Sequence, residues 1–131
     1  IDGKTDMVEF ARYPMDWEWQ SKEKARERFA YYQKLCKLKT TNETLADGAF
    51  QILCADGQVL AYARFSDKQM LVTICSMDSE QTKVILPIGD YGFGGEHVTE
   101  IFGKDVTFEM ADGILTVHVP SRESLLLELR K

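Results

Sequence analysis

The sequence is poor in the residues from which many active sites are built. Its 131 residues include two histidines and three cysteines, Cys36, Cys54 and Cys75. The cysteines lie in apolar surroundings and show no C-x-x-C spacing, which predicts buried free thiols and argues against disulfides or a metal site. We therefore expect no metal ion and no cofactor. Because unpaired thiols favour a reducing compartment, we also expect a cytoplasmic location.

Positive charge and long apolar runs are scarce as well. Sixteen Lys and Arg residues stand against 21 Asp and Glu residues, which gives a formal net charge of −5. The densest basic stretch, 22–28, has Glu23 and Glu27 interleaved with its cations, a pattern typical of a solvated helix face. Phosphate binding relies on clustered basic side chains, so we expect no nucleic-acid partner. No apolar run has the length of a membrane span or a signal sequence, so we expect no membrane partner.

The length of the chain limits what it can contain. At 131 residues and 15.0 kDa it has the size of one domain. A complete (β/α)8 barrel needs at least about 200 residues, so this chain is too short to hold one. Because its first residue is Ile1 and not Met, we expect a processed chain or a fragment.

One amphipathic helix is predicted, over 21–38. Ser21 is a candidate N-cap, and Glu23 lies in the first turn. An apolar stripe follows at helical spacing and consists of Ala25, Phe29, Tyr32 and Cys36. We expect the part of the stripe formed by Phe29, Tyr32 and Cys36 to be only partly covered and therefore to favour self-association.

From residue 48 onward the pattern changes to short apolar runs separated by turn residues. The predicted strands are 49–54, 58–66, 69–76, 81–87, 97–102, 105–110, 114–119 and 124–129. Asp56-Gly57 and Asp112-Gly113 stand between such runs and predict type I′ hairpins. The chain therefore predicts a mainly β fold, an eight-stranded antiparallel β-sandwich with Greek-key-like connections, preceded by one α-helix.

Two of these strands carry more specific predictions. In 58–66, small and apolar side chains at every second position predict one buried face. The three consecutive leucines at 125–127 predict a last strand that is covered on both sides.

The sequence shows no catalytic motif. His97 and His118 have no partner at metal-ligand spacing, which favours structural or surface roles. Asp and Glu are plentiful, but none is marked as one of a glycosidase pair. The glycine-rich segment 89–95 lacks the strand-to-helix context of a dinucleotide site and predicts a crossover loop. We expect no catalytic residue.

Two aromatic residues in that loop, Tyr91 and Phe93, allow two interpretations. An exposed ring can stack on a sugar, which makes both residues candidates for carbohydrate binding. Alternatively, the two rings pin the loop to the sandwich, and this interpretation is favoured because no third aligned aromatic is apparent.

Several short sequence words follow one another in a defined order. They are R-x-P-M-x-W at 12–17, Y-Y-x-x-L-x-x-L at 31–38, G-x-F-x-x-L at 48–53, A-x-x-R at 61–64, V-x-L-P at 84–87, G-x-L-x-V-x-V-P at 113–120 and S-L-L-L-E at 124–128. This order resembles the C-terminal end of α-amylase family glycoside hydrolases, especially the neopullulanase and cyclomaltodextrinase group.

The resemblance implies a division of the chain into three parts. Residues 1–20 would be a loop from the end of a missing catalytic barrel, 21–39 the last barrel helix, and 48–131 the C-terminal β-sandwich. In that family the loop lines the sugar cleft, which implies substrate contacts for Arg12 and Trp17. Packing of Trp17 against a barrel is the alternative.

The resemblance also implies a function for the parent protein. The family's catalytic Asp, Glu and second Asp lie on barrel strands that precede this region, so the chain alone would be inactive. It would stabilise the catalytic (β/α)8 barrel of an enzyme that acts on α-glucosidic bonds, and α-glucan would be a second partner. Two other functions stay open, a carbohydrate-binding module with Tyr91, Phe93 and Tyr62 as its platform and an adhesion or interaction sandwich unrelated to sugars.

Overall fold

A computed structural model of the chain describes residues 17–95 and 97–131. The chain divides into two compact units, Ile1–Leu38 and Lys39–Lys131. In the part of the chain that the structure describes, no helix combines the length and the apolar character that crossing a bilayer requires.

The helical part begins with a short 3-10 helix that the sequence did not predict. This helix, η1, spans Trp17–Ser21, and the long helix α2 spans Glu23–Thr41. The Ser21 hydroxyl donates to the Glu18 carbonyl at 2.7 Å, a bond inside η1. Ser21 therefore ends η1, and its predicted role as the N-cap of α2 is wrong.

Helix α2 continues beyond its predicted end at Leu38 and is followed by a second short helix. Helix α3 spans Glu43–Asp47. Asn42 has extended backbone angles, and its side-chain oxygen accepts a hydrogen bond from the Leu45 amide at 3.0 Å. A single capping residue thus separates the two helices, because an Asn side chain satisfies one of the amides that a helix start leaves without a partner.

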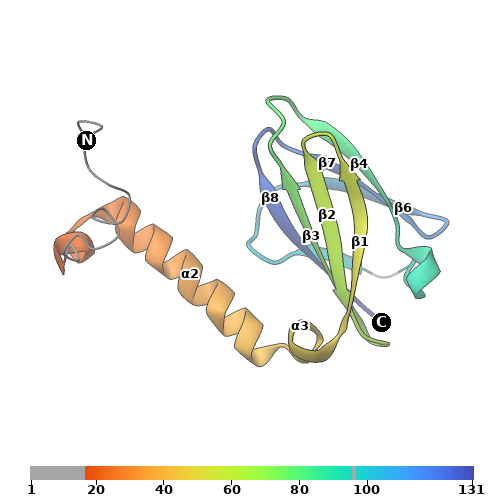
Figure 1. The fold of residues 1–131 in the computed structure, drawn as a ribbon, viewed down its shortest axis with the longest axis horizontal. Helices are drawn as coiled ribbons and strands as arrows, with labels where there is room; N and C mark the ends of the chain where they lie inside the picture. The colour runs from red at the N-terminus through yellow and green to blue at the C-terminus, as the bar shows by residue number, and fades with distance from the viewer. Residues whose placement is uncertain (1–16, 96) are drawn as a thin grey trace, which may run out of the picture. The chain divides into compact units, whose positions relative to one another are not determined.

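Within residues 17–95 and 97–131, eight strands form two antiparallel sheets, which confirms the predicted β-sandwich. The strands are β1 (Ala49–Asp56), β2 (Val59–Phe65), β3 (Gln69–Ser76), β4 (Thr82–Pro87), β5 (His97–Glu100), β6 (Thr107–Ala111), β7 (Ile114–Val119) and β8 (Ser124–Arg130). The five-stranded sheet has the order β1-β2-β3-β8-β5, and the three-stranded sheet has the order β4-β7-β6. Figure 1 shows the two sheets lying face to face.

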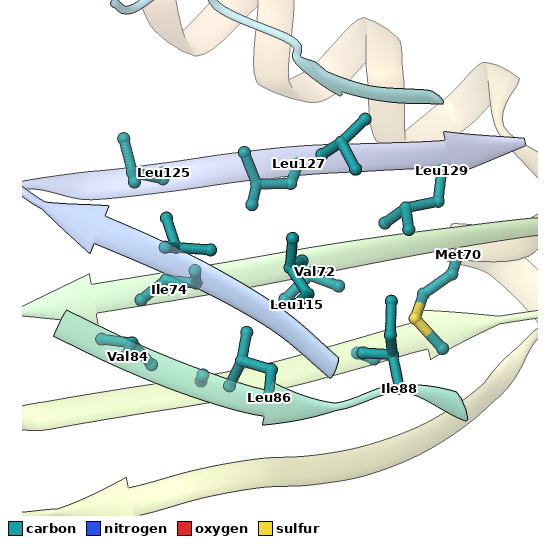
Figure 2. Packing of buried hydrophobic residues seen from close by; sticks show 14 of the residues in the cluster. Met70, Val72, Ile74, Val84, Leu86, Ile88, Leu115, Leu125, Leu127 and Leu129 are labelled. Carbon is teal, nitrogen blue, oxygen red and sulfur yellow. The ribbon is translucent and has the colours of Figure 1, made fainter. Parts of the chain in front are cut away.

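The core consists of aliphatic side chains that alternate along the central strands of both sheets. In β8, Leu125 and Leu127 are buried, whereas Leu126 is only partly buried on the outer face. The prediction that this strand is covered on both sides is therefore wrong. Figure 2 shows how the two sheets share this layer, with Met70, Val72, Ile74, Val84, Leu86, Ile88, Leu115, Leu125, Leu127 and Leu129.

The two predicted type I′ hairpins have different outcomes. Asp112 and Gly113 join β6 to β7, and both have positive φ, 50° and 75°, as a type I′ turn requires. Between β1 and β2, however, Asp56 pairs with Val59, so the turn residues are Gly57 and Gln58. Of these two, only Gly57 has a positive φ, 54°, and the type I′ prediction is wrong at this turn.

The alternation in β8 generates a stability prediction. Leu127→Ala should lower the free energy of unfolding by about 2–5 kcal/mol, because it leaves a cavity between the two sheets. Leu126→Ala removes the same atoms from a partly exposed position and should cost well under half as much. Urea unfolding of both variants measures the difference, and equal losses would contradict this assignment of inner and outer positions.

Candidate functional site

The four predicted contact residues fall in different parts of the chain. Arg12 lies outside the described residues. Trp17 belongs to η1 in the helical unit, and its side chain is 78% exposed. Tyr91 and Phe93 belong to the sandwich unit, in the connection between β4 and β5.

The rings of Tyr91 and Phe93 pack onto the sandwich. Tyr91 is half-buried against Phe65, with 5.0 Å between ring centroids. Phe93 is 1% exposed, and the Lys131 ammonium lies 4.4 Å from the centre of its ring. A ring buried to this degree offers no face to a sugar. The geometry therefore corresponds to the packing interpretation of this loop, and Phe93 is removed from the candidate platform.

Two glycines fix the same loop at a close backbone contact. The Gly89 amide donates to the Gly113 carbonyl at 2.7 Å. A Cβ built on Gly113 would lie 2.8 Å from the Gly89 Cα, which is closer than real Cβ atoms approach. The glycine-rich segment is thus a crossover between the two sheets that is held against the β6-β7 hairpin.

The helical unit carries an apolar hollow of about 320 Å³. Its walls are Trp19, Ala25, Arg28, Phe29 and Tyr32. Trp19 packs on Phe29 with 4.7 Å between ring centroids, and this contact holds η1 against the first turns of α2. Phe29 and Tyr32 remain 47% and 60% exposed. Self-association through this stripe stays a prediction.

Among the clefts of the sandwich unit, two have volumes of about 400 and 410 Å³. Lys68, Gln69 and Arg130 contribute to the first cleft, and Asp56 and Asp78 contribute to the second. In the second cleft the Asp78 carboxylate already accepts hydrogen bonds, from the Thr82 hydroxyl at 3.1 Å and from the Glu80 amide at 3.3 Å. Its carboxylate therefore serves the turn between β3 and β4.

The described residues were also compared for metal-ligating groups and for the exposure of their thiols. Among the described residues, no group of three His, Cys, Asp or Glu side chains could hold a metal ion. Cys54 and Cys75 are half-buried, and Cys36 is exposed on α2. The expectation of a buried thiol is wrong for Cys36, which lies on a helix that has no buried residue.

One charged cluster has a clear structural role. The Lys104 ammonium lies 2.5 Å from the Glu123 carboxylate and donates to the Ser124 carbonyl at 2.6 Å. The Glu100 carboxylate accepts from the Lys104 amide at 2.8 Å. The hydrogen bond from Lys104, together with that from the Ser124 amide, lowers the pKa of Glu123. These bonds tie the connection between β5 and β6 to the start of β8.

Sequence reasoning missed an exposed apolar surface on the five-stranded sheet. Phe50, Ile52 and Leu60 are 55%, 50% and 43% exposed. The signal was present in the sequence, because β2 alternates Ala61 and Ala63 with Leu60 and Tyr62, so both of its faces are apolar. The alternation in β2 was used to predict only the buried face, so the exposed face with Leu60 and Tyr62 was missed.

The fold is similar to part of several solved structures of alpha-amylases and of a debranching enzyme. An Anoxybacillus alpha-amylase matches with a TM-score of 0.67 and 21% identity, over 79% of this chain and 22% of that chain. A Nostoc punctiforme debranching enzyme matches with a TM-score of 0.65 and 17% identity, over 79% and 21%. A maltogenic alpha-amylase, AmyB from Thermotoga neapolitana, matches with a TM-score of 0.63 and 18% identity, over 79% and 25%.

These likenesses establish the fold. This chain spans about a fifth to a quarter of the length of the solved chains that it matches. No family model and no curated protein matches the sequence.

The Lys104–Glu123 pair generates a pH prediction. Because the pKa of Glu123 is lowered in the folded state, its stabilisation is present above the unfolded value of 4.5 and is lost as pH falls through the folded value. Glu123→Gln should cost at most about 1 kcal/mol at pH 7, since both side chains are partly exposed. Urea unfolding of the wild type and of Glu123→Gln at pH 7 and pH 3 measures the cost in unfolding free energy at each pH.

The difference between Glu123→Gln and the wild type should shrink at the lower pH. Glu80→Gln removes an exposed negative charge and serves as the matched control for net charge. A cost for Glu123→Gln that stays the same at both pH values would contradict an ionic contribution.

Proposed function

We propose that this chain is the non-catalytic C-terminal part of an α-glucan-acting glycoside hydrolase of the neopullulanase or cyclomaltodextrinase type. The observation that supports this most is the structural match of 79% of this chain to about a fifth of an alpha-amylase chain and of a debranching enzyme chain. The order of sequence words along the chain points to the same family. Its function would be to stabilise a catalytic barrel that precedes it.

The chemistry of the described residues favours a non-catalytic, stabilising role. The polar and charged groups that meet in the sandwich unit hold turns and loops, as Asp78 and Glu123 do. Hydrolysis of a glycosidic bond requires two carboxyl groups that face each other across that bond, about 5–9.5 Å apart. In the cleft that Asp56 and Asp78 line, the Asp78 carboxylate is engaged by the Thr82 hydroxyl and the Glu80 amide.

The domain assignment follows from the same proposal. Residues 1–20 would be a loop of the barrel, 21–39 its last helix, and 48–131 the accessory sandwich. Helix α2 has the length of a barrel helix, and its exposed side chains Phe29 and Tyr32 are those that a barrel would cover. Substrate contact through Arg12 and Trp17 would then require the rest of the barrel.

A carbohydrate-binding function is the second candidate, and the exposure of Trp17 favours it. An indole that is 78% exposed offers a stacking surface for a sugar ring. Tyr91 adds only a half-buried ring. This function would be independent of a barrel, which makes the two candidates separable.

Hydrolysis is the first test of the proposed function. The purified chain should leave starch, pullulan and cyclodextrins intact in a reducing-sugar assay, while the gene upstream of Ile1 should encode barrel strands with the family's catalytic carboxylates. Hydrolysis that follows the chain through successive purification steps, or an upstream sequence without a barrel, would contradict the proposal.

Sugar binding is the second test. Titration of the chain with maltoheptaose should give no saturable change in tryptophan fluorescence at millimolar sugar, because in the proposed function Trp17 contributes to a sugar cleft only together with the barrel. Saturable binding that Trp17→Ala abolishes and Tyr91→Ala leaves unchanged would instead support a carbohydrate-binding module.

A further inference from the structure

The dipeptide Asp-Gly occurs four times in this chain. The four sites are Asp2-Gly3, Asp47-Gly48, Asp56-Gly57 and Asp112-Gly113. The first lies outside the described residues, the second ends helix α3, and the other two lie at hairpin turns. Glycine carries no side chain that hinders attack of its nitrogen on the preceding aspartate, so Asp-Gly is prone to rearrangement of its backbone. Because the three described sites share the same chemistry, their surroundings decide which of them reacts.

The rearrangement converts aspartate to isoaspartate and needs no oxidant or cofactor. The glycine nitrogen attacks Cγ of the protonated aspartate carboxyl group, a C–N bond forms, and one water molecule leaves. The product is a five-membered succinimide ring. Water then adds to the backbone carbonyl carbon of the aspartate, and the C–N bond at that carbon breaks. The chain afterwards continues through Cγ, with one additional main-chain carbon and a free α-carboxylate. To reach the ring, the peptide unit between the two residues must turn toward the aspartate side chain.

The surroundings of Asp47-Gly48 oppose that turn. The Gly48 amide, which would supply the attacking nitrogen, donates to the Thr44 carbonyl at 3.0 Å. A Cβ built on Gly48 would lie 2.8 Å from the Phe65 carbonyl oxygen, which is closer than real Cβ atoms approach. Turning this peptide unit would therefore break a hydrogen bond and push backbone against backbone.

Asp112-Gly113 is enclosed by the crossover loop. The Gly113 carbonyl accepts from the Gly89 amide at 2.7 Å, and a Cβ built on Gly113 would lie 2.8 Å from the Gly89 Cα. On another side, a Cβ built on Gly94 would lie 3.2 Å from the Gly113 Cα. Gly113 thus has backbone of the same loop packed against it at two positions, and its peptide unit is held.

Asp56-Gly57 lies in open surroundings. Both residues are exposed, and a Cβ built on Gly57 would meet no atom of the described residues within 4 Å. The Met77 amide donates to the Gln58 carbonyl at 2.9 Å, so this turn is held one residue beyond the reacting peptide unit. Strand β1, which leads into the turn, is the edge strand of its sheet, and its pairing with β2 is irregular between Ile52 and Cys54. A turn at the end of an edge strand opens at a lower cost than backbone inside a sheet.

We propose that Asp56-Gly57 is the described Asp-Gly site at which this chain forms isoaspartate. The chemical class of enzyme that would act on the product is a carboxyl methyltransferase, which transfers a methyl group from S-adenosylmethionine to the free α-carboxylate. Asp56 also lines the cleft of about 410 Å³, which gives water a path to the ring for its hydrolysis. The additional main-chain carbon would displace Asp56 from its pairing with Val59. This inference is independent of the proposed function, because it concerns the chemistry of one hairpin.

Site-by-site measurement of isoaspartate in the aged chain tests the proposal. The 131-residue chain is incubated at neutral pH, folded and, in parallel, in urea, and electron-transfer dissociation of its peptides distinguishes isoaspartate from aspartate. In the folded chain, isoaspartate should accumulate several-fold faster at Asp56 than at Asp47 or Asp112. In urea the three rates should converge, because the contacts of Gly48 and Gly113 are lost there. Equal rates at the three sites in the folded chain, or a slower rate at Asp56 than at either other site, would overturn the proposal.

Methylation gives a second readout. The aged, folded chain is treated with a purified isoaspartyl carboxyl methyltransferase and labelled S-adenosylmethionine. Among the peptides of the three described sites, the one that contains Asp56 should carry the label. Asp56→Glu should remove it, because attack on a glutamate closes a six-membered ring, which forms more slowly. Asp47→Glu alters an exposed aspartate at an identical dipeptide and is the matched control, so it should leave the label unchanged. An unlabelled Asp56 peptide beside a labelled Asp47 or Asp112 peptide would overturn the proposal.

Discussion

Packing of the two sheets against each other is the constraint on which the rest of this structure depends. A single layer of aliphatic side chains from β3 and β8 meets a layer from β4 and β7, and these side chains are almost completely buried (Figure 2). Burial of apolar surface is the main favourable term in such a fold. Because β4 leaves one sheet and β5 joins the other, the loop between them must cross the end of this layer, and the Gly89–Gly113 contact holds it there.

Much of this architecture could be predicted from the sequence, because it follows from local patterns. Each predicted strand exists, since alternation and turn residues act over a few positions. The role of Ser21 depends on which backbone group its hydroxyl binds, and the turn type at Gln58 depends on which residues pair across the hairpin. The periodicity of the sequence carries no information on either point. The prediction that the strand with leucines 125–127 is covered on both faces was wrong for a similar reason. Three consecutive leucines do not show which face of β8 remains exposed.

The candidate site was harder to predict. Phe93 and Tyr91 are close in the sequence and chemically alike, yet one ring is buried and the other half-buried. Their environment is set by Phe65 and Lys131, which are distant in the chain. Conversely, the exposed apolar surface of the five-stranded sheet is formed by residues of more than one strand. It becomes visible only when the register brings Ile52, Tyr62 and Leu126 into one row.

In this account the sandwich has one apolar layer that forms its own core, and the proposed function gives it a second task, the support of a barrel that precedes it. Calorimetry of the isolated chain and of the whole protein tests this most directly. The account predicts that the sandwich unfolds at a higher temperature in the whole protein, because a barrel that binds only the folded sandwich would shift its unfolding equilibrium. An unfolding transition of the sandwich with the same midpoint in both proteins would contradict it.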